Sequence, residues 1–251
     1  GFAMMSVTRS AMGMANNSGP ELYLSIRTRF LDDALLSAVS ESSIRQTVIL
    51  AAGMDTRAFR LKWPAGMTVY EIDRDDVFDR KEDVLGRLNA RPACDRRIIR
   101  ADLAKPWVQN LLDAAGFDPA RPTAILAEGL LMYLDERAAI DLFTGLKTLA
   151  CEGSWIGMDV VNPEMLTSVY TAAYMKKLAE LACPWTFGVS DPEAFLAEHG
   201  WRGEWITPGE PPANYGRWPF PVAPRSMPGL PRTFLVTARR AMDVVDGRSP
   251  D

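Results

Sequence analysis

The sequence predicts an α/β protein built on a doubly wound, mostly parallel β-sheet. Three observations support this fold class. Apolar runs and helical stretches alternate about every 20 to 30 residues, which is typical of successive βαβ units. The apolar runs lack the alternation of half-exposed strands, as expected for central strands buried on both faces. Small or acidic residues follow the first four runs, and right-handed crossovers bring such strand ends to one edge of a sheet.

The predicted elements follow one another from Pro20 without a linker. A first helix is predicted over 20–39, because its apolar residues recur at helical spacing and Pro20 suits a first turn. The polar residues 55–57 can cap a short helix that includes Phe59 and Leu61. The other predicted helices are 74–88, 107–115, 135–150, 163–181 and 190–198. The predicted strands are 47–52, 67–73, 96–103, 122–126, 155–161, 203–207 and 233–237, the last of them antiparallel to its neighbours.

Length and charge narrow the class of protein. The 251 residues, 47% of them hydrophobic, suffice for one α/β domain, which we place at 20–242 between a flexible N-terminus (1–19) and a polar tail (243–251). The net charge of −4 and the pI near 5.2 give no basic field for nucleic acid or an anionic membrane. No apolar run reaches the roughly 18 residues that span a bilayer, and no signal peptide is recognised. We expect a cytoplasmic protein with a small-molecule partner.

The three cysteines, Cys94, Cys151 and Cys183, are far apart in the sequence and match no metal-binding spacing. Free cysteines are usually packed as small apolar residues, so we expect reduced thiols and no metal site.

The stretch 47–73 contains the first candidate binding site. Gly53 lies in the turn after the first strand, and Asp73 lies at the tip of the second, where a carboxylate can accept hydrogen bonds from ribose hydroxyls. A dinucleotide site would need GxGxxG in this turn, whereas the chain has AAGMDT, with one glycine. A nicotinamide cofactor is therefore disfavoured. S-adenosyl-L-methionine contains adenosine but no phosphate, and it requires only a turn of small residues.

Five strings resemble the leucine carboxyl methyltransferase family, in particular its bacterial polyketide O-methyltransferase branch. They are LAAGMDTRAFRL, YEID, RADL, AEGLLMYL and the loop YGRWPFP with its following PR. The resemblance runs from about Arg27 to the final strand. It implies a class I S-adenosyl-L-methionine-dependent methyltransferase fold, with a seven-stranded, mostly parallel sheet, one antiparallel strand and helices on both faces.

The resemblance also implies that S-adenosyl-L-methionine is the cofactor and S-adenosyl-L-homocysteine the product. It assigns the methionine carboxylate to Arg27, the methionine amino group to Glu128 and the ribose hydroxyls to Asp73. The first turn would approach the cofactor at Ala51 and Gly53, where Ala51 replaces a glycine that is frequent in the family. The contacts to the adenine edge would come from Asp102 and the amide of Leu103.

The resemblance implies a small, polyketide-like aromatic acceptor, and chemistry favours a carboxylate as the methylated group. A carboxylate is ionised at neutral pH and needs no general base. The only histidine, His199, ends a short helix and is interpreted as structural, so no catalytic residue is assigned. A phenol or hydroxyl activated by Asp, Glu or Tyr is the alternative, followed by a protein C-terminal carboxylate. A non-catalytic cofactor-binding module and a nicotinamide oxidoreductase come after these.

Candidate acceptor-binding residues lie in and near two expected lids, at about 163–190 and 208–231. The second lid is rich in proline, glycine and aromatic residues, and a long loop of this kind often covers a site. Arginine could pair with an acceptor carboxylate, while tyrosine could pack on its rings. Exposure or packing within the loop is an equally good interpretation of these side chains. The candidates are Tyr133, Tyr215, Arg217 and Arg225.

Overall fold

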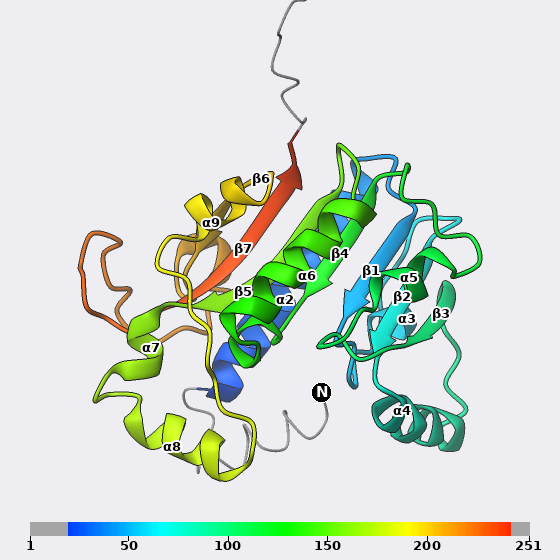
Figure 1. Cartoon of the computed structure of the whole chain (residues 1–251). Coiled ribbons are helices and arrows are strands. Elements are labelled where there is room, and N and C mark those ends of the chain that lie inside the picture. The colour runs from blue at the N-terminus through cyan, green and yellow to red at the C-terminus, as the bar shows by residue number, and fades with distance from the viewer. Residues whose placement is uncertain (1–19, 242–251) are drawn as a thin grey trace, which may run out of the picture.

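The computed structural model describes residues 20–241, which form one seven-stranded sheet with helices on both faces (Figure 1). The expectations for 1–19 and 243–251 lie outside the described residues. The strand order is β3-β2-β1-β4-β5-β7-β6, in which β7 is antiparallel to β5 and β6 and all other neighbours are parallel. The predicted fold class is therefore confirmed. The strands are β1 (Gln46–Leu50), β2 (Thr68–Asp73), β3 (Asp95–Arg100), β4 (Thr123–Ala127), β5 (Trp155–Val161), β6 (Trp201–Ile206) and β7 (Thr233–Arg240).

The helices between the strands are mostly short. They are α2 (Pro20–Ser40), α3 (Arg57–Arg60), α4 (Asp75–Arg87), α5 (Val108–Leu112), α6 (Glu136–Leu149), α7 (Pro163–Thr167), α8 (Ala172–Glu180) and α9 (Pro192–Glu198), with 3₁₀ turns η1 (Leu131–Tyr133) and η2 (Pro211–Ala213). Within residues 20–241, none of them combines the length and the apolar character that crossing a bilayer requires.

Successive residues of β1 pack against opposite layers of helices. Val48 and Leu50 belong to the apolar layer that contains residues of α5, α6 and α9, whereas Ile49 belongs to the layer of α2, α3 and α4. All five residues of β1 are buried. The uninterrupted apolar run in the sequence is thus explained by burial on both faces.

The predicted helix over 163–181 is wrong as a single element. The chain forms α7 and α8 instead, and the hydroxyl of Ser168 accepts a hydrogen bond from the backbone N–H of Tyr170 at 3.2 Å in the segment between them. A serine side chain that binds nearby backbone in this way competes with the hydrogen bonds of a continuous helix. The third strand also ends earlier than predicted, at Arg100, so that Asp102 lies in the turn that follows it.

The turn after β1 has an unusual backbone. Ala51 and Gly53 both adopt left-handed conformations, with φ of 49° and 45°. Such a conformation suits glycine but is strained in a residue with a Cβ atom. The methyl group of Ala51 is therefore accommodated at a cost in stability.

Candidate functional site

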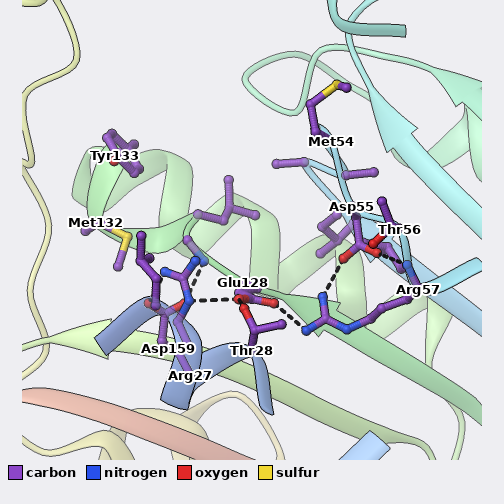
Figure 2. A pocket seen from close by; sticks show the side chains of 18 of the residues that line it. Arg27, Thr28, Met54, Asp55, Thr56, Arg57, Glu128, Met132, Tyr133 and Asp159 are labelled. Atoms are coloured by element: carbon purple, nitrogen blue, oxygen red, sulfur yellow. Dashed lines mark hydrogen bonds and ion pairs between the residues drawn. The ribbon is translucent and has the colours of Figure 1, made fainter. Parts of the chain in front are cut away.

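A pocket of about 310 Å³ lies at the carboxyl ends of β1 and β4, beside β5. Six parts of the chain form its walls: α2, the end of β1, the turn and α3 over 51–60, the loop 128–133, β5, and the segment containing α8. Figure 2 shows that charged side chains from α2, from α3 and from the loop after β4 face one another on one side, while Met132 and Tyr133 lie on another. The pocket thus has a charged side and an aromatic side.

Glu128, directly after β4, is held by cations from two helices. Its Oε1 accepts hydrogen bonds from Nε of Arg27 at 2.8 Å and from the hydroxyl of Thr28 at 3.0 Å. Its Oε2 lies 2.6 Å from Nη2 of Arg57 (Figure 2). Burial opposes ionisation of this carboxyl, but Arg27 and Arg57 outweigh it and lower the pKa of Glu128 to about 2. Glu128 is therefore a carboxylate at any physiological pH.

Asp159, in the middle of β5, is the second carboxylate on Arg27. Its Oδ2 lies 2.9 Å from Nη1 of Arg27 and accepts a hydrogen bond from the hydroxyl of Tyr23 at 2.8 Å, while Oδ1 accepts one from the backbone N–H of Gly129 at 2.6 Å. Burial and the Asp159 charge raise the pKa of Tyr23 well above its ordinary value, so that hydroxyl stays a donor. Asp159 was not among the predicted site residues, although an acidic residue inside an otherwise apolar strand was a signal.

Arg57 joins the pocket to α2. Its side chain is only 2% exposed; Nε lies 2.6 Å from Asp32, Nη1 pairs with Asp55 and Nη2 with Glu128. Burial raises the pKa of Asp55, and the Arg57 charge offsets part of that rise. Asp55 and Arg57 were predicted only to cap a helix, and Asp55 does accept a hydrogen bond from the backbone N–H of Arg57 at 2.6 Å.

Two further predicted acidic residues lie outside the pocket lining, at or just after the ends of the neighbouring strands β2 and β3. The carboxylate of Asp73, at the end of β2, accepts hydrogen bonds from the backbone N–H groups of Gly53 at 2.7 Å and Arg74 at 2.8 Å. In the turn after β3, Asp102 accepts one from Ala104 at 3.0 Å, and Leu103 packs against the core. Ala51, Gly53, Arg27 and Glu128 line the pocket, whereas Asp73, Asp102 and Leu103 do not.

The aromatic side of the pocket is built from η1, α8 and the segment after α8. The ring of Trp185 stands edge-on to Tyr133, with centroids 6.0 Å apart, and to Tyr174, with centroids 5.3 Å apart. Met132 lies next to them in the lining. The indole N–H of Trp185 is buried and has no hydrogen-bond partner among the described residues. This side offers rings and one uncommitted donor.

Comparisons with known proteins agree on one family. A model of the family described as leucine carboxyl methyltransferase matches residues 8–147, more than half of the chain. A relative from Parafrankia sp. (strain EAN1pec) that carries the name of an S-adenosyl-L-methionine-dependent methyltransferase is 42% identical over 221 residues, which cover 88% of this chain and 69% of the relative. The chain belongs to the leucine carboxyl methyltransferase family.

Solved structures support the fold of this methyltransferase. One from Thermobifida fusca, described as a methyltransferase, has a TM-score of 0.65 at 18% identity and covers 94% of this chain and 88% of its own. A DUF574 family protein from Streptomyces avermitilis has a TM-score of 0.63 at 16% identity, with 95% and 89% covered. The cofactor of the family is S-adenosyl-L-methionine, as the sequence predicted.

The charged side of the methyltransferase pocket fits the amino-acid end of this cofactor. Buried carboxylates and guanidinium groups alternate there, in the order Asp159, Arg27, Glu128 and Arg57. A zwitterion needs a cation and an anion side by side, and a guanidinium offers several donors to one carboxylate. The residues present can hold the cofactor's carboxylate and its ammonium group.

Three predicted acceptor-binding residues lie away from the lining of the methyltransferase pocket. Tyr215 is 37% exposed and donates a hydrogen bond to Asp33 at 3.3 Å. Arg225 pairs with Glu210 at 2.9 Å, and Arg217 is exposed. Of the four candidates, only Tyr133 lines the pocket. Contact of the other three with an acceptor stays a prediction.

The histidine and the three cysteines of the methyltransferase lie outside the pocket lining. His199 forms a 2.7 Å hydrogen bond through Nδ1 with the carbonyl oxygen of Phe195 and packs on Phe143. All three cysteines are free thiols. In the part of the chain that the structure describes, no group of His, Cys, Asp and Glu side chains is arranged to hold a metal ion.

Proposed function

We propose that the protein is an S-adenosyl-L-methionine-dependent O-methyltransferase that methylates a carboxylate on a small aromatic molecule of the polyketide kind. The observation that carries the proposal is the division of one pocket into a charged side and an aromatic side. The charged side suits the cofactor, and the rings of Tyr133, Tyr174 and Trp185 suit a flat acceptor.

We assign the cofactor contacts by position along the sheet edge. Arg27 binds the methionine carboxylate and Glu128 the amino group, while the backbone at Ala51 and Gly53 passes close to the cofactor. Asp73 binds the ribose hydroxyls. From the methionine end to the adenine end, the assigned contacts follow β4, β1, β2 and β3, which are neighbours in that order in the sheet. This supports an extended cofactor lying across these strand ends. The contacts to adenine are assigned to Asp102 and the amide of Leu103.

The chemistry required of the protein is positioning and the exclusion of water. When bound, S-adenosyl-L-methionine supplies an electrophilic methyl group on a sulfonium ion. An acceptor whose ring packs on the aromatic side would place its carboxylate beside this methyl group. The carboxylate has no proton to lose before it reacts. Opposite charges are neutralised during the transfer, so a pocket that excludes water favours it. The distance of His199 from this pocket is consistent with an acceptor that needs no base.

A phenol or hydroxyl acceptor is the second candidate. Asp55 lines the pocket, and its pKa is raised because burial disfavours the carboxylate, with the Arg57 charge offsetting part of the rise. A carboxylate of increased basicity is a better proton acceptor than an ordinary one. Asp55 is the group that we assign to this role if the acceptor is a phenol.

A methyl-transfer screen with labelled cofactor distinguishes the two acceptors. Aromatic carboxylic acids are compared with analogues in which the carboxyl group is absent and a phenol remains. The proposal expects label in methyl esters that mild alkali hydrolyses. Label only in alkali-stable aryl ethers would replace the carboxyl acceptor by the phenol.

Two tyrosines of the same segment test the aromatic side. Tyr174→Ala removes a ring from the pocket, whereas Tyr170→Ala removes one that is 83% exposed between α7 and α8. We expect the first substitution to raise the Michaelis constant for the acceptor about tenfold, corresponding to the loss of one good ring contact. The dissociation constant for S-adenosyl-L-homocysteine should stay unchanged, and Tyr170→Ala should behave as wild type. Equal effects of the two substitutions would contradict this acceptor site.

A further inference from the structure

The ion-pair cluster on the charged side of the pocket contains more carboxylates than cations once Asp32, which does not line the pocket, is included. Its connected ion pairs join four carboxylates, those of Asp32, Asp55, Glu128 and Asp159, to the guanidinium groups of Arg27, Arg57 and Arg60. Among the described residues, this cluster therefore carries one excess negative charge.

The carboxyl groups of the cluster are all placed as ionised acceptors. Both oxygens of Asp55 receive donors from Arg57, one from its backbone N–H and one from its guanidinium. Both oxygens of Asp159 likewise receive N–H or O–H donors. A protonated carboxyl group would present a donor where each of these arrangements requires an acceptor.

The substrate and product forms of the cofactor differ by one charge. Both contain the same amino-acid group, ribose and adenine, but S-adenosyl-L-methionine has a sulfonium and S-adenosyl-L-homocysteine a neutral thioether. Contacts to the shared groups cancel when the two affinities are divided. The ratio of the affinity for S-adenosyl-L-methionine to that for S-adenosyl-L-homocysteine therefore measures how strongly the surrounding residues stabilise the sulfonium charge.

We propose that the excess carboxylate of this cluster is a specificity determinant, which favours binding of the cationic cofactor over its neutral product. Asp159 is the clearest contributor, because it is wholly buried and lies in the pocket wall (Figure 2). Water screens a buried charge weakly, so it acts over a longer distance than one at the surface. After transfer the sulfonium charge is gone, and the cluster no longer holds the product by this attraction.

Removing a negative charge and removing a positive charge from the cluster should change the ratio of the two affinities in opposite directions. Asp159→Asn removes the excess negative charge, so it should lower the affinity for S-adenosyl-L-methionine relative to S-adenosyl-L-homocysteine. Arg60→Gln removes a cation from the same cluster, and it should raise that ratio. The change in Asp159→Asn should be about tenfold, which is the order expected for one unit charge roughly 10 Å away at an effective dielectric constant of about 20. The change in Arg60→Gln should be smaller, because water screens a side chain that is 38% exposed. Structural damage would not move the ratio in opposite directions.

The experiment measures both dissociation constants by calorimetry on the whole chain, without an acceptor. Sinefungin, a chemically stable cationic analogue, replaces S-adenosyl-L-methionine in a repeat. Glu71→Gln is the matched control, because Glu71 is also wholly buried and ion-paired but lies outside the pocket, with Lys81 at 2.7 Å. It should leave the ratio at the wild-type value even though the fold is weakened.

The outcomes are decisive in either direction. A lowered ratio in Asp159→Asn with a raised ratio in Arg60→Gln supports the proposal. Shifts of the same sign, no shift, or an equal shift in Glu71→Gln overturn it. If Asp159→Asn does not fold, Arg60→Gln decides alone, since its side chain is 38% exposed and the substitution is tolerable. The inference depends on the cofactor and not on the acceptor, so failure of the methyl-transfer screen would leave it standing.

Discussion

Replacing Asp73 by alanine should weaken both the fold and the cofactor site. The carboxylate of Asp73 is 8% exposed and fixes two backbone N–H groups, that of Gly53 in the first turn and that of Arg74 at the start of α4. Alanine removes both acceptors. The turn after β1 and the end of β2 would then lose this side-chain link and keep only backbone contacts such as the hydrogen bond from Ala52 to Ile72.

The expected loss of stability can be worked from these two contacts. A hydrogen bond to a charged group contributes about 1.5–3 kcal/mol, and a buried donor left without a partner costs about 1–3 kcal/mol. Arg74 is exposed, so water can replace its partner, whereas Gly53 is buried and its N–H stays unsatisfied. We expect Asp73→Ala to lower the free energy of unfolding by about 2–4 kcal/mol.

Urea denaturation of the cofactor-free protein measures this change, and calorimetry with S-adenosyl-L-homocysteine measures the effect on binding. We expect the affinity to fall at least about 30-fold, as for truncation of one side of a buried charged contact. Asp102→Ala is the comparison, because the Asp102 side chain is 35% exposed and accepts its backbone hydrogen bond from Ala104 in its own turn. It should reduce affinity with little change in stability. An Asp73→Ala protein that unfolds at the wild-type urea concentration would refute the reasoning.

Three further predictions concern other charged and strained positions. Ala51→Gly should raise the free energy of unfolding by about 0.5–1 kcal/mol in urea denaturation, since it relieves a left-handed alanine but frees the unfolded chain. Glu71→Gln should lower that free energy by about 3–5 kcal/mol, because Lys81 stays buried without its carboxylate. The folded pKa of Glu128, about 2, is below its ordinary value of 4.5, so its ion pairs stabilise the protein above pH 4.5 and are lost as the pH falls towards 2. Acid titration of unfolding should show this loss, and Glu128→Gln should reduce it.

The sheet was predictable because its strands are buried on both faces. Val48, Ile49 and Leu50 face two different helix layers, and that arrangement produces an apolar run visible without a structure. The ends of α7 and α8 were not predictable in the same way. Their separation depends on the side chain of Ser168 competing with a helical hydrogen bond, which a pattern of apolar spacing does not register.

Site residues at strand ends could be predicted from the sequence. Site residues whose partners lie on distant helices or strands could not. Gly53 and Asp73 follow β1 and β2 directly, and the structure joins them by a 2.7 Å hydrogen bond. Asp159 and Arg57 are different, because their importance comes from partners 132 and 25 positions away, at Arg27 and Asp32. Only the folded sheet shows that these four side chains belong to one cluster.

The same cluster holds α2 on the sheet and forms the cofactor side of the pocket. Arg57 links Asp32 of α2 to Glu128 after β4, and Arg27 links α2 to Asp159 of β5. Truncating Arg27 or Arg57 would leave Asp159 or Asp55 without its ion pair, and an unpaired buried charge costs about 3–5 kcal/mol. A substitution that changes cofactor preference there will thus also tend to loosen α2. Arg60 is the exception, because its side chain is partly exposed and its partner Asp32 stays paired with Arg57 after truncation.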